Sequence, residues 1–451
     1  MTPEIITGLI MIAIFLIMAL LMYLEKLSTI LVLPLMAVLF AVVSIASHLI
    51  KLGLNSGLSG FEMIKYVIYQ YYNLQYYNLI IDIFTTGSMR IHAAIFTTIF
   101  GGMLAIYIKN LKIAEKMIYW TAEFAGDKPM IIGAALFIVT MILFSSVGGL
   151  GAVIMIGTII LPILSSVGIS PVAGAGIFLL GICAGGTMNP GNAKLYMETY
   201  KIPQEDVIRF AMYVLLVYIV CGIFWMAIMV RKSTMSNFWA EKIQNPKVTI
   251  SPLAFVSPIV PVILVFFFKV DPIVAFILSL LYTFTVSIKK GCVRLFCKSI
   301  IEGSQAVMPA CILMIGIGML FQTVSNKNVN EYLNPILIKV IPKSLLFYII
   351  GFGLAAPLAL YRGPLNVWGL GIGVGALIYG TGILSPQAVM GMLISVGMIQ
   401  GVCDPTNTHN VWIGSYQGIT PNYILRKTLP FVWIGAFASV SISAFIFVGF
   451  K

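Results

Sequence analysis

Four ionisable side chains lie in or beside runs apolar enough to cross a bilayer: Lys194, Arg362, Asp404 and His409. Arginine at mid-bilayer costs about 2.5–3.5 kcal/mol on translocon scales, so Arg362 should pair with a charge or line a cavity. Its guanidinium fork matches a carboxylate, which makes it a candidate for binding an anionic substrate; a salt bridge to Asp404 is the structural alternative. Lys194 could contribute to the same site or extend its long stem to the membrane surface.

Asp404 and His409 are the candidates for coupling to an ion. A carboxylate in a desolvated break of a helix can take up a proton or help to coordinate Na⁺, and histidine titrates near neutral pH when unperturbed. Each has a structural alternative, Asp404 as a helix cap and His409 as a hydrogen-bonded core residue. The six cysteines show neither a disulfide pattern nor zinc-ligand spacing, so we expect no metal site and no cofactor.

Lys194, Asp404 and His409 lie in two interrupted apolar segments, at 171–200 and 386–416, whereas Arg362 lies between the apolar runs 344–360 and 363–380. Asn189-Pro190 and Asp404-Pro405 match the pattern of an N-cap followed by proline at the first helical position. Irregular backbone at membrane depth is tolerated only where protein or a water-filled cavity surrounds it. A half-helix that begins there directs unpaired N–H groups and the positive end of its dipole into the membrane, where they can hold an anion.

Two other pairs of apolar runs are joined by almost no polar loop, and they predict re-entrant hairpins at 129–166 and 344–380. We expect the hairpin tips and the breaks to meet at mid-depth around a small polar solute. The other residues expected at this site are Ser145, Ser146, Gly148, Thr187, Asn189, Asn192, Gly363, Asn366, Thr406 and Asn407, with Asn410 and Lys194 as possible additions.

The composition places these features in a membrane. Of 451 residues, 60% are hydrophobic and 9% are charged, whereas soluble domains carry about 25% charged residues. The net charge of +12 is not concentrated on a soluble basic face, which argues against nucleic-acid binding. A tyrosine-rich segment at 62–82 fits an interfacial helix. Full crossings of about 20 apolar residues are predicted near 4–23, 27–48, 91–108, 206–229, 252–269, 271–288, 306–323 and 424–449.

The unusual features recur at a separation of 215 or 216 residues, which predicts two repeats at 1–230 and 251–451, joined by a cytoplasmic linker at 231–250. Each repeat would hold five crossings, one of them broken, plus one re-entrant hairpin. Because five is odd, the second repeat would be inverted. The expected fold is therefore an all-α polytopic membrane protein. The matching positions are Gly87 and Gly303, Gly102 and Gly318, Gly148 and Gly363, Pro171 and Pro386, and Pro190 and Pro405.

The basic residues predict the orientation of this chain. The side that holds the linker, 109–128 and 289–305 carries more of the lysines and arginines, so it should be cytoplasmic. Both termini would then lie outside. The expected location is the inner (cytoplasmic) membrane.

The order of elements resembles the ion transporter superfamily of secondary carriers, and within it the gluconate:proton symporters and their relatives for C4-dicarboxylates and citrate. The resemblance covers roughly 85–230 and 300–450. It is carried by Asn-Pro-Gly at 189–191, by Arg362 at a hairpin tip and by Asp404-Pro405. It implies a carboxylate substrate, proton or sodium coupling, a homodimer, and elevator-like movement of hairpins and broken helices against a scaffold.

The sequence thus predicts a secondary transporter, not an enzyme, that moves a small organic anion with H⁺ or Na⁺ and contacts membrane lipid but no nucleic acid. One alternative is a cation/proton antiporter of the same superfamily, with Asp404 as the exchange site and Arg362 as its partner. An intramembrane enzyme is disfavoured because the chain has no His-Glu-x-x-His spacing and no evident nucleophile and base pair. A channel is disfavoured because re-entrant breaks suit a single occluded site.

Overall fold

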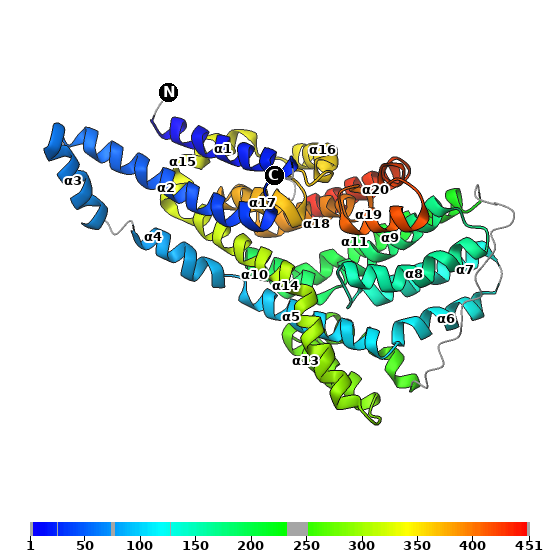
Figure 1. Ribbon diagram of the computed structural model, residues 1–451. Helices are drawn as coiled ribbons and strands as arrows, with labels where there is room; N and C mark the ends of the chain where they lie inside the picture. The colour runs from blue at the N-terminus through cyan, green and yellow to red at the C-terminus, as the bar shows by residue number, and fades with distance from the viewer. Residues whose placement is uncertain (1–2, 25, 74–76, 127, 232–250, 449–451) are drawn as a thin grey trace.

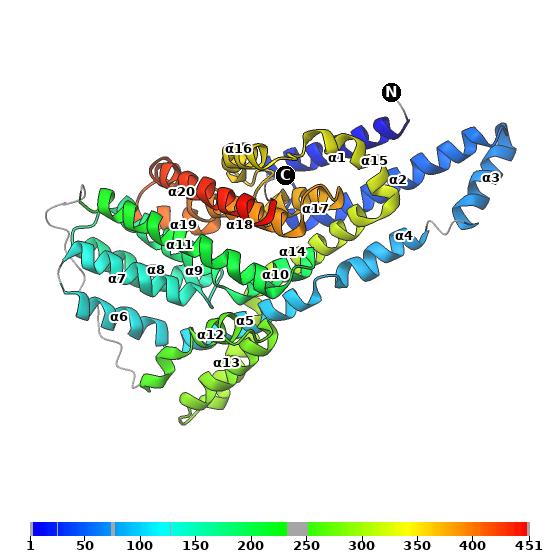
Figure 2. The ribbon, with the colours of Figure 1, turned by 180° about the vertical axis from the view of Figure 1, so that it is seen from behind.

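The computed structural model describes residues 3–24, 26–73, 77–126, 128–231 and 251–448. These ranges form helices and turns with no strand among them, arranged as an elongated bundle (Figures 1 and 2). Helices α1–α3 and α15 lie toward one end of the bundle and α6–α8 toward the other. All but Arg231 of the predicted linker at 231–250 falls outside the described residues.

The described residues of the first half of the chain form eleven α-helices and a short π-helical turn. Their bounds are α1 (Pro3–Tyr23), α2 (Thr29–Asn55), α3 (Gly60–Asn73), α4 (Tyr77–Asp82), η1 (Ile83–Gly87), α5 (His92–Asn110), α6 (Ile113–Ala125), α7 (Pro129–Phe144), α8 (Leu150–Ser166), α9 (Pro171–Thr187), α10 (Pro190–Tyr200) and α11 (Gln204–Met229).

The second half has a similar order. Its elements are η2 (Pro252–Val256), α12 (Val260–Phe266), α13 (Pro272–Val286), α14 (Cys292–Ser325), α15 (Lys327–Val340), α16 (Leu345–Ala355), η3 (Ala356–Ala359), η4 (Val367–Gly371), α17 (Ile372–Gly380), α18 (Pro386–Cys403), α19 (Thr408–Gln417), α20 (Pro421–Ser443) and η5 (Ala444–Val448).

Proline sets the starting point of many of these helices. Proline occupies the start of α7, α9, α10, α13, α18 and α20. Its φ is fixed near the helical value, and the N–H that it lacks would have no partner in a first turn. The prolines therefore divide an almost continuously apolar sequence into separate helices.

Seven helices among the described residues are long and apolar enough to cross a membrane, and two bent pairs bring the possible number to nine. The predicted crossings at 252–269 and 271–288 are shorter than expected, since α12 has 7 residues and α13 has 15. Ten full crossings are therefore not present in the form predicted. The segments predicted as re-entrant hairpins fold as the helix pair α7 and α8 and as α16 followed by η4 and α17.

Two crossings are longer than predicted. The segments Tyr77–Asn110 and Cys292–Ser325 each span 34 residues, where crossings at 91–108 and 306–323 were expected. The predicted interfacial helix at 62–82 is divided accordingly, because 77–82 belongs to the long span and α3 ends at Asn73.

The two long helical segments cross at glycines. A Cβ added to Gly102 would lie 2.7 Å from the Gly303 carbonyl oxygen, and one added to Gly303 would lie 2.5 Å from Met103 Cα. At the other end of the contact, Gly318 packs directly on the backbone of Gly87. Helix backbones approach this closely only where small residues face each other, as in other membrane helix pairs. This crossing forms the centre of the molecule and places α10 beside α5.

Candidate site at the broken helices

Asp404 joins the second break to the tip of the second hairpin. Its carboxylate accepts hydrogen bonds from the backbone N–H groups of Tyr361 (3.0 Å) and Arg362 (3.3 Å), and from the Asn366 side-chain amide (3.2 Å). Thr406 donates two more, from its backbone N–H (2.9 Å) and its hydroxyl (2.7 Å). The side chain is 1% exposed. Five donors around one buried carboxylate fix the hairpin tip to the end of α18.

This arrangement corrects the predicted cap. The second half-helix does not begin at Pro405 but at Thr408, and its N-cap is Asn407, whose side chain accepts from the His409 N–H at 3.2 Å. Asp404 instead caps the end of α18. Both Asp404 and Asn407 are good capping residues, but the Asp404 carboxylate is bound to the N–H groups of the hairpin tip.

The hairpin tip contains strained backbone. Tyr361 and Arg362 have φ values of +52° and +55°, in the left-handed region that side chains with a Cβ rarely adopt. In this conformation their two successive N–H groups both reach Asp404. The carboxylate therefore offsets strain that costs on the order of 1–3 kcal/mol for each residue.

Arg362 meets Asp404 through its backbone N–H, and its guanidinium takes part in none of the ion pairs within the described ranges. The salt-bridge alternative for this arginine is therefore not what the structure contains. The side chain is partly exposed at the hairpin tip. A guanidinium placed there remains available to an anion.

The returning helix of this hairpin starts later than Pro364, at Val367. The Asn366 side-chain amide bridges the Ala359 carbonyl and Asp404, each at 3.2 Å, and the Val367 N–H donates to the Gln400 side chain at 2.9 Å. Gly363 lies against the Leu358 carbonyl with no room for a Cβ. The second hairpin thus docks on the broken helix of its own half of the chain.

The first break follows the prediction. Asn189 is the N-cap of α10, its side chain accepts from the Gly191 N–H at 2.9 Å, and Pro190 is the first helical residue. Asn192 donates to the Gly186 carbonyl at 2.9 Å, and the Thr187 hydroxyl donates to the Ala184 carbonyl at 2.7 Å. The helices α9 and α10 are bent by 51° at this point.

The tip of the first hairpin carries a buried hydroxyl that lacks a partner. Ser145 donates to the Ile142 carbonyl at 2.6 Å. Ser146 is 2% exposed, and its Oγ makes no hydrogen bond within the described residues. Beyond it the tip opens, because Gly148 is exposed and a Cβ added to it would meet no described atom within 4 Å. Buried polar atoms are nearly always paired, so Ser146 is a candidate ligand contact.

The two breaks lie next to each other because Gly401 of α18 packs directly against the Cys183 sulfur of α9. Near this contact, the Asn410 amide donates to the carbonyls of Val402 (3.1 Å) and Asp404 (2.8 Å), while its Oδ1 has no partner among the described residues. None of the hydrogen bonds within the described ranges joins Arg362 or its hairpin tip to Asn189 or Asn192.

Lys194 is buried in an ion-pair cluster. Its ammonium lies 2.7 Å from Asp271 and 3.3 Å from Glu198, and its side chain is 8% exposed. Asp271 also caps α13. Lys194 therefore connects α10 to the start of α13 and does not extend to the membrane surface.

Sequence reasoning missed one polar chain within the long spans. The Arg90 guanidinium donates to Gln322 at 2.7 Å, and Gln322 donates to Asp82 at 2.6 Å. Arg90 also lies 4.6 Å from the centre of the Phe321 ring. Asp82 fell within the interfacial helix predicted at 62–82, and Gln322, which bridges it to Arg90, lies on another helix.

Models of known protein families give no match to this chain, and neither do curated protein sequences. Among solved structures, a similar fold occurs in the YdaH transporter of Alcanivorax borkumensis, whose crystal structure is described as having an unusual topology. The TM-score is 0.58, with 91% of this chain and 98% of that chain covered at 13% identity. The chain is therefore an all-α polytopic membrane protein that shares its fold with a transporter.

Proposed function

We propose that the protein is a secondary active transporter, not an enzyme, which moves a small organic anion, most simply a carboxylate, together with H⁺ or Na⁺. The observation that carries the proposal is the pair of broken helices that meet at Cys183 and Gly401, each resuming in a half-helix with an asparagine cap. Helix N-termini at membrane depth stabilise an anionic group. The fold shared with a transporter supports the same conclusion.

In this proposal Arg362 binds the substrate carboxylate, and Ser146 and Asn410 supply neutral hydrogen bonds. Both have buried polar atoms without partners in the described structure. His409 remains the candidate for coupling. Asp404 is better suited to holding the hairpin tip, because five donors already occupy its carboxylate. The same contacts weigh against a cation/proton antiporter that exchanges ions at Asp404.

Arg362→Lys is expected to weaken carboxylate binding at least about tenfold, because lysine keeps the charge but loses the bidentate fork. Lysine meets the same left-handed backbone strain as arginine, so the change isolates the side chain. Binding is measured by the thermal shift of the purified protein over a panel of mono-, di- and tricarboxylates. The matched control is Arg426→Lys on the exposed face of α20. Equal binding by both variants would remove Arg362 from the site.

We also propose that the two halves of the chain are inverted repeats. Gly87 and Gly102 have Gly303 and Gly318 as counterparts in the repeat, yet Gly87 packs on Gly318 and Gly102 on Gly303. Each glycine thus packs on the repeat counterpart of the other, and residue numbers that rise along Tyr77–Asn110 meet numbers that fall along α14. This reciprocal, antiparallel pattern is typical of a two-fold axis, which for membrane-crossing helices lies in the membrane plane.

Inverted repeats place the bases of the two hairpins on opposite sides of the membrane. Single cysteines at Ser166 and Lys343, both exposed at hairpin bases, should then react with an impermeant maleimide from opposite faces in a background that lacks the six native cysteines. Reaction of both from one face would contradict the inversion. The same assay tests the orientation in the inner membrane. We propose that 109–128 lies on the cytoplasmic side and that both termini lie outside, so cysteines at these places should react from those faces.

The proposed movement is an elevator in which hairpins and broken helices shift against a scaffold built around α5 and α14, within a homodimer. Contacts that such a shift would exchange join α10 and the start of α11 to α12 and the loop before α13. They are the Lys194–Asp271 pair, the Lys269–Glu205 pair and the Gln204 bonds to the carbonyls of Val265 and Val270.

A further inference from the structure

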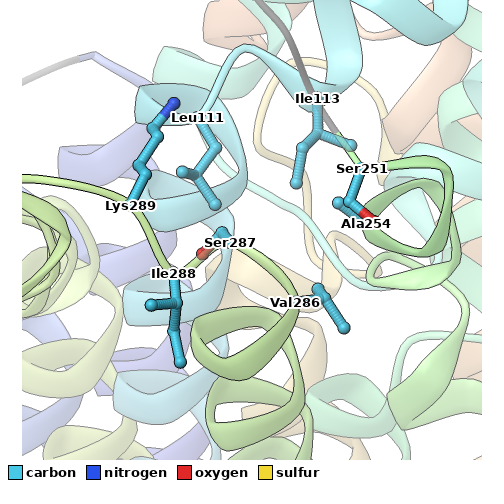
Figure 3. Close-up of a pocket in the computed structure, with 8 residues that line it drawn as sticks. All are labelled: Leu111, Ile113, Ser251, Ala254, Val286, Ser287, Ile288 and Lys289. Carbon is cyan, nitrogen blue, oxygen red and sulfur yellow. The ribbon is translucent and has the colours of Figure 1, made fainter.

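A pocket outside the candidate site opens where membrane-crossing segments end (Figure 3). It encloses about 150 Å³ between the turn after α5, the start of α6 and the end of α13. The span Tyr77–Asn110 ends just before Leu111, and the span Cys292–Ser325 begins just after Lys289. The pocket therefore lies at the ends of two segments that are apolar and long enough to cross a membrane.

The lining combines an apolar wall with a basic rim. Leu111, Ile113 and Val286 supply the wall, and Figure 3 shows the Lys289 side chain along the edge, beside the segment that carries the Ser287 hydroxyl. Lys290 follows Lys289 in the turn before α14.

The rim is positively charged. Lys289, Lys290 and Lys109 at the end of α5 are exposed. None of these three takes part in an ion pair within the described ranges. Lys112, in the turn between α5 and α6, pairs with Glu115 at 3.8 Å. Lys289 thus lines the opening, and Lys290 and Lys109 lie within two residues of lining residues along the chain, all three without a carboxylate partner among the described residues.

The neighbouring helix α6 has the features of an interfacial helix. Ile113 and Ile118 are buried, whereas Trp120 is 48% exposed and Phe124 is 97% exposed. The Trp120 ring lies against Phe255 with centroids 4.7 Å apart. Tryptophan prefers the headgroup level of a bilayer, and amphipathic helices with exposed aromatics lie in that plane. An interfacial α6 would place the pocket, which Ile113 lines, beside lipid headgroups.

We propose that this pocket binds an anionic phospholipid of the surrounding bilayer, with the phosphate held by Lys289, Lys290 and Lys109 and the glycerol end against Leu111 and Val286. Basic pockets between membrane helices hold such headgroups. A volume of about 150 Å³ is below the roughly 300 Å³ typical of pockets that bury a whole small molecule. It suits part of a lipid whose chains stay in the bilayer.

The test measures lipid binding to the purified full-length chain in detergent by native mass spectrometry. The probes are dioleoylphosphatidylglycerol, dioleoylphosphatidylcholine and inorganic phosphate. Lys289→Ala with Lys290→Ala should weaken phosphatidylglycerol binding about thirtyfold, which corresponds to about 1 kcal/mol for each lysine near an anionic lipid. The matched control, Lys339→Ala with Lys343→Ala, removes the same charge elsewhere and should change binding less than about twofold, since lysines away from the pocket add little.

A second variant, Val286→Phe, fills the pocket and keeps every lysine. It should also weaken phosphatidylglycerol binding, which separates a seated lipid from a ligand held by surface charge alone. The proposal fails if phosphatidylcholine binds as tightly as phosphatidylglycerol, if both pocket variants bind like the wild type, or if inorganic phosphate alone competes fully, which would mark a site for the free ion. Because no transport is measured, the result does not depend on the proposed carrier function.

Discussion

Asp404→Ala is expected to lower the free energy of unfolding by about 3 kcal/mol or more, because a buried donor left without a partner costs about 1–3 kcal/mol. Five donors converge on this carboxylate, two of them from strained residues at the hairpin tip. The free energy of unfolding of Asp404→Asn should lie between those of Asp404→Ala and the wild type. One side-chain oxygen remains as an acceptor, but the amide adds a donor that faces other donors. Denaturant unfolding of the purified protein in detergent gives the value.

The control for this prediction removes a single donor. Thr406→Val deletes one hydroxyl of the five contacts, so a loss of about 1 kcal/mol is expected. If Asp404→Ala is no more destabilising than Thr406→Val, the carboxylate does not hold the hairpin tip. That result would instead favour the role predicted from the sequence, in which Asp404 couples transport to H⁺ or Na⁺.

The second large effect is expected at the crossing of α5 and α14. Gly303→Ala should destabilise the protein by about 3 kcal/mol, at the upper end of the range for overpacking. Its Cβ would meet the backbone of Met103 and Gly102 at 2.5–2.7 Å, and backbone cannot turn away as a side chain does. Thermal unfolding in detergent checks the change.

The matched control is Gly151→Ala in α8, where a Cβ meets nothing within 4 Å among the described residues. This change should lie within about 0.5 kcal/mol of the wild type, as is usual for open sites. Similar stabilities of the two variants would show that the crossing is loose enough to accept side chains, and the reciprocal glycine contacts would then no longer support a two-fold axis.

Local signals in the sequence were sufficient for part of the fold. Asn189-Pro190 predicted the start of α10, because a cap and a proline act on their own helix. The helices within 129–166 and 344–380 followed from apolar runs separated by short polar segments. These features depend on residues within one or two turns of each other.

Features decided by tertiary contact could not be predicted in the same way. Asp404 and Asn407 both suit an N-cap, and only the N–H groups of Tyr361 and Arg362, some 40 residues earlier, determine that Asn407 takes that place. Residues 62–82 likewise fitted an interfacial helix on their tyrosines, although 77–82 belongs to a long span.

The charges of Asp82 and Arg90 are accommodated inside a long span because Gln322 on α14 bridges them. Lys194 could have reached the surface, but Asp271 lies 2.7 Å away on another element. Each of these outcomes depends on a partner that is distant in the sequence.

The central claim is that the protein carries an organic anion through the site at the two breaks. Its most direct test is uptake of a labelled carboxylate, chosen from the thermal-shift panel, into proteoliposomes with an imposed H⁺ or Na⁺ gradient. We expect saturable, gradient-driven uptake by the wild type and by Arg426→Lys, and uptake reduced at least about tenfold in Arg362→Lys at subsaturating carboxylate. Collapse of a pH gradient by Na⁺ without any carboxylate, and no carboxylate uptake, would contradict the account.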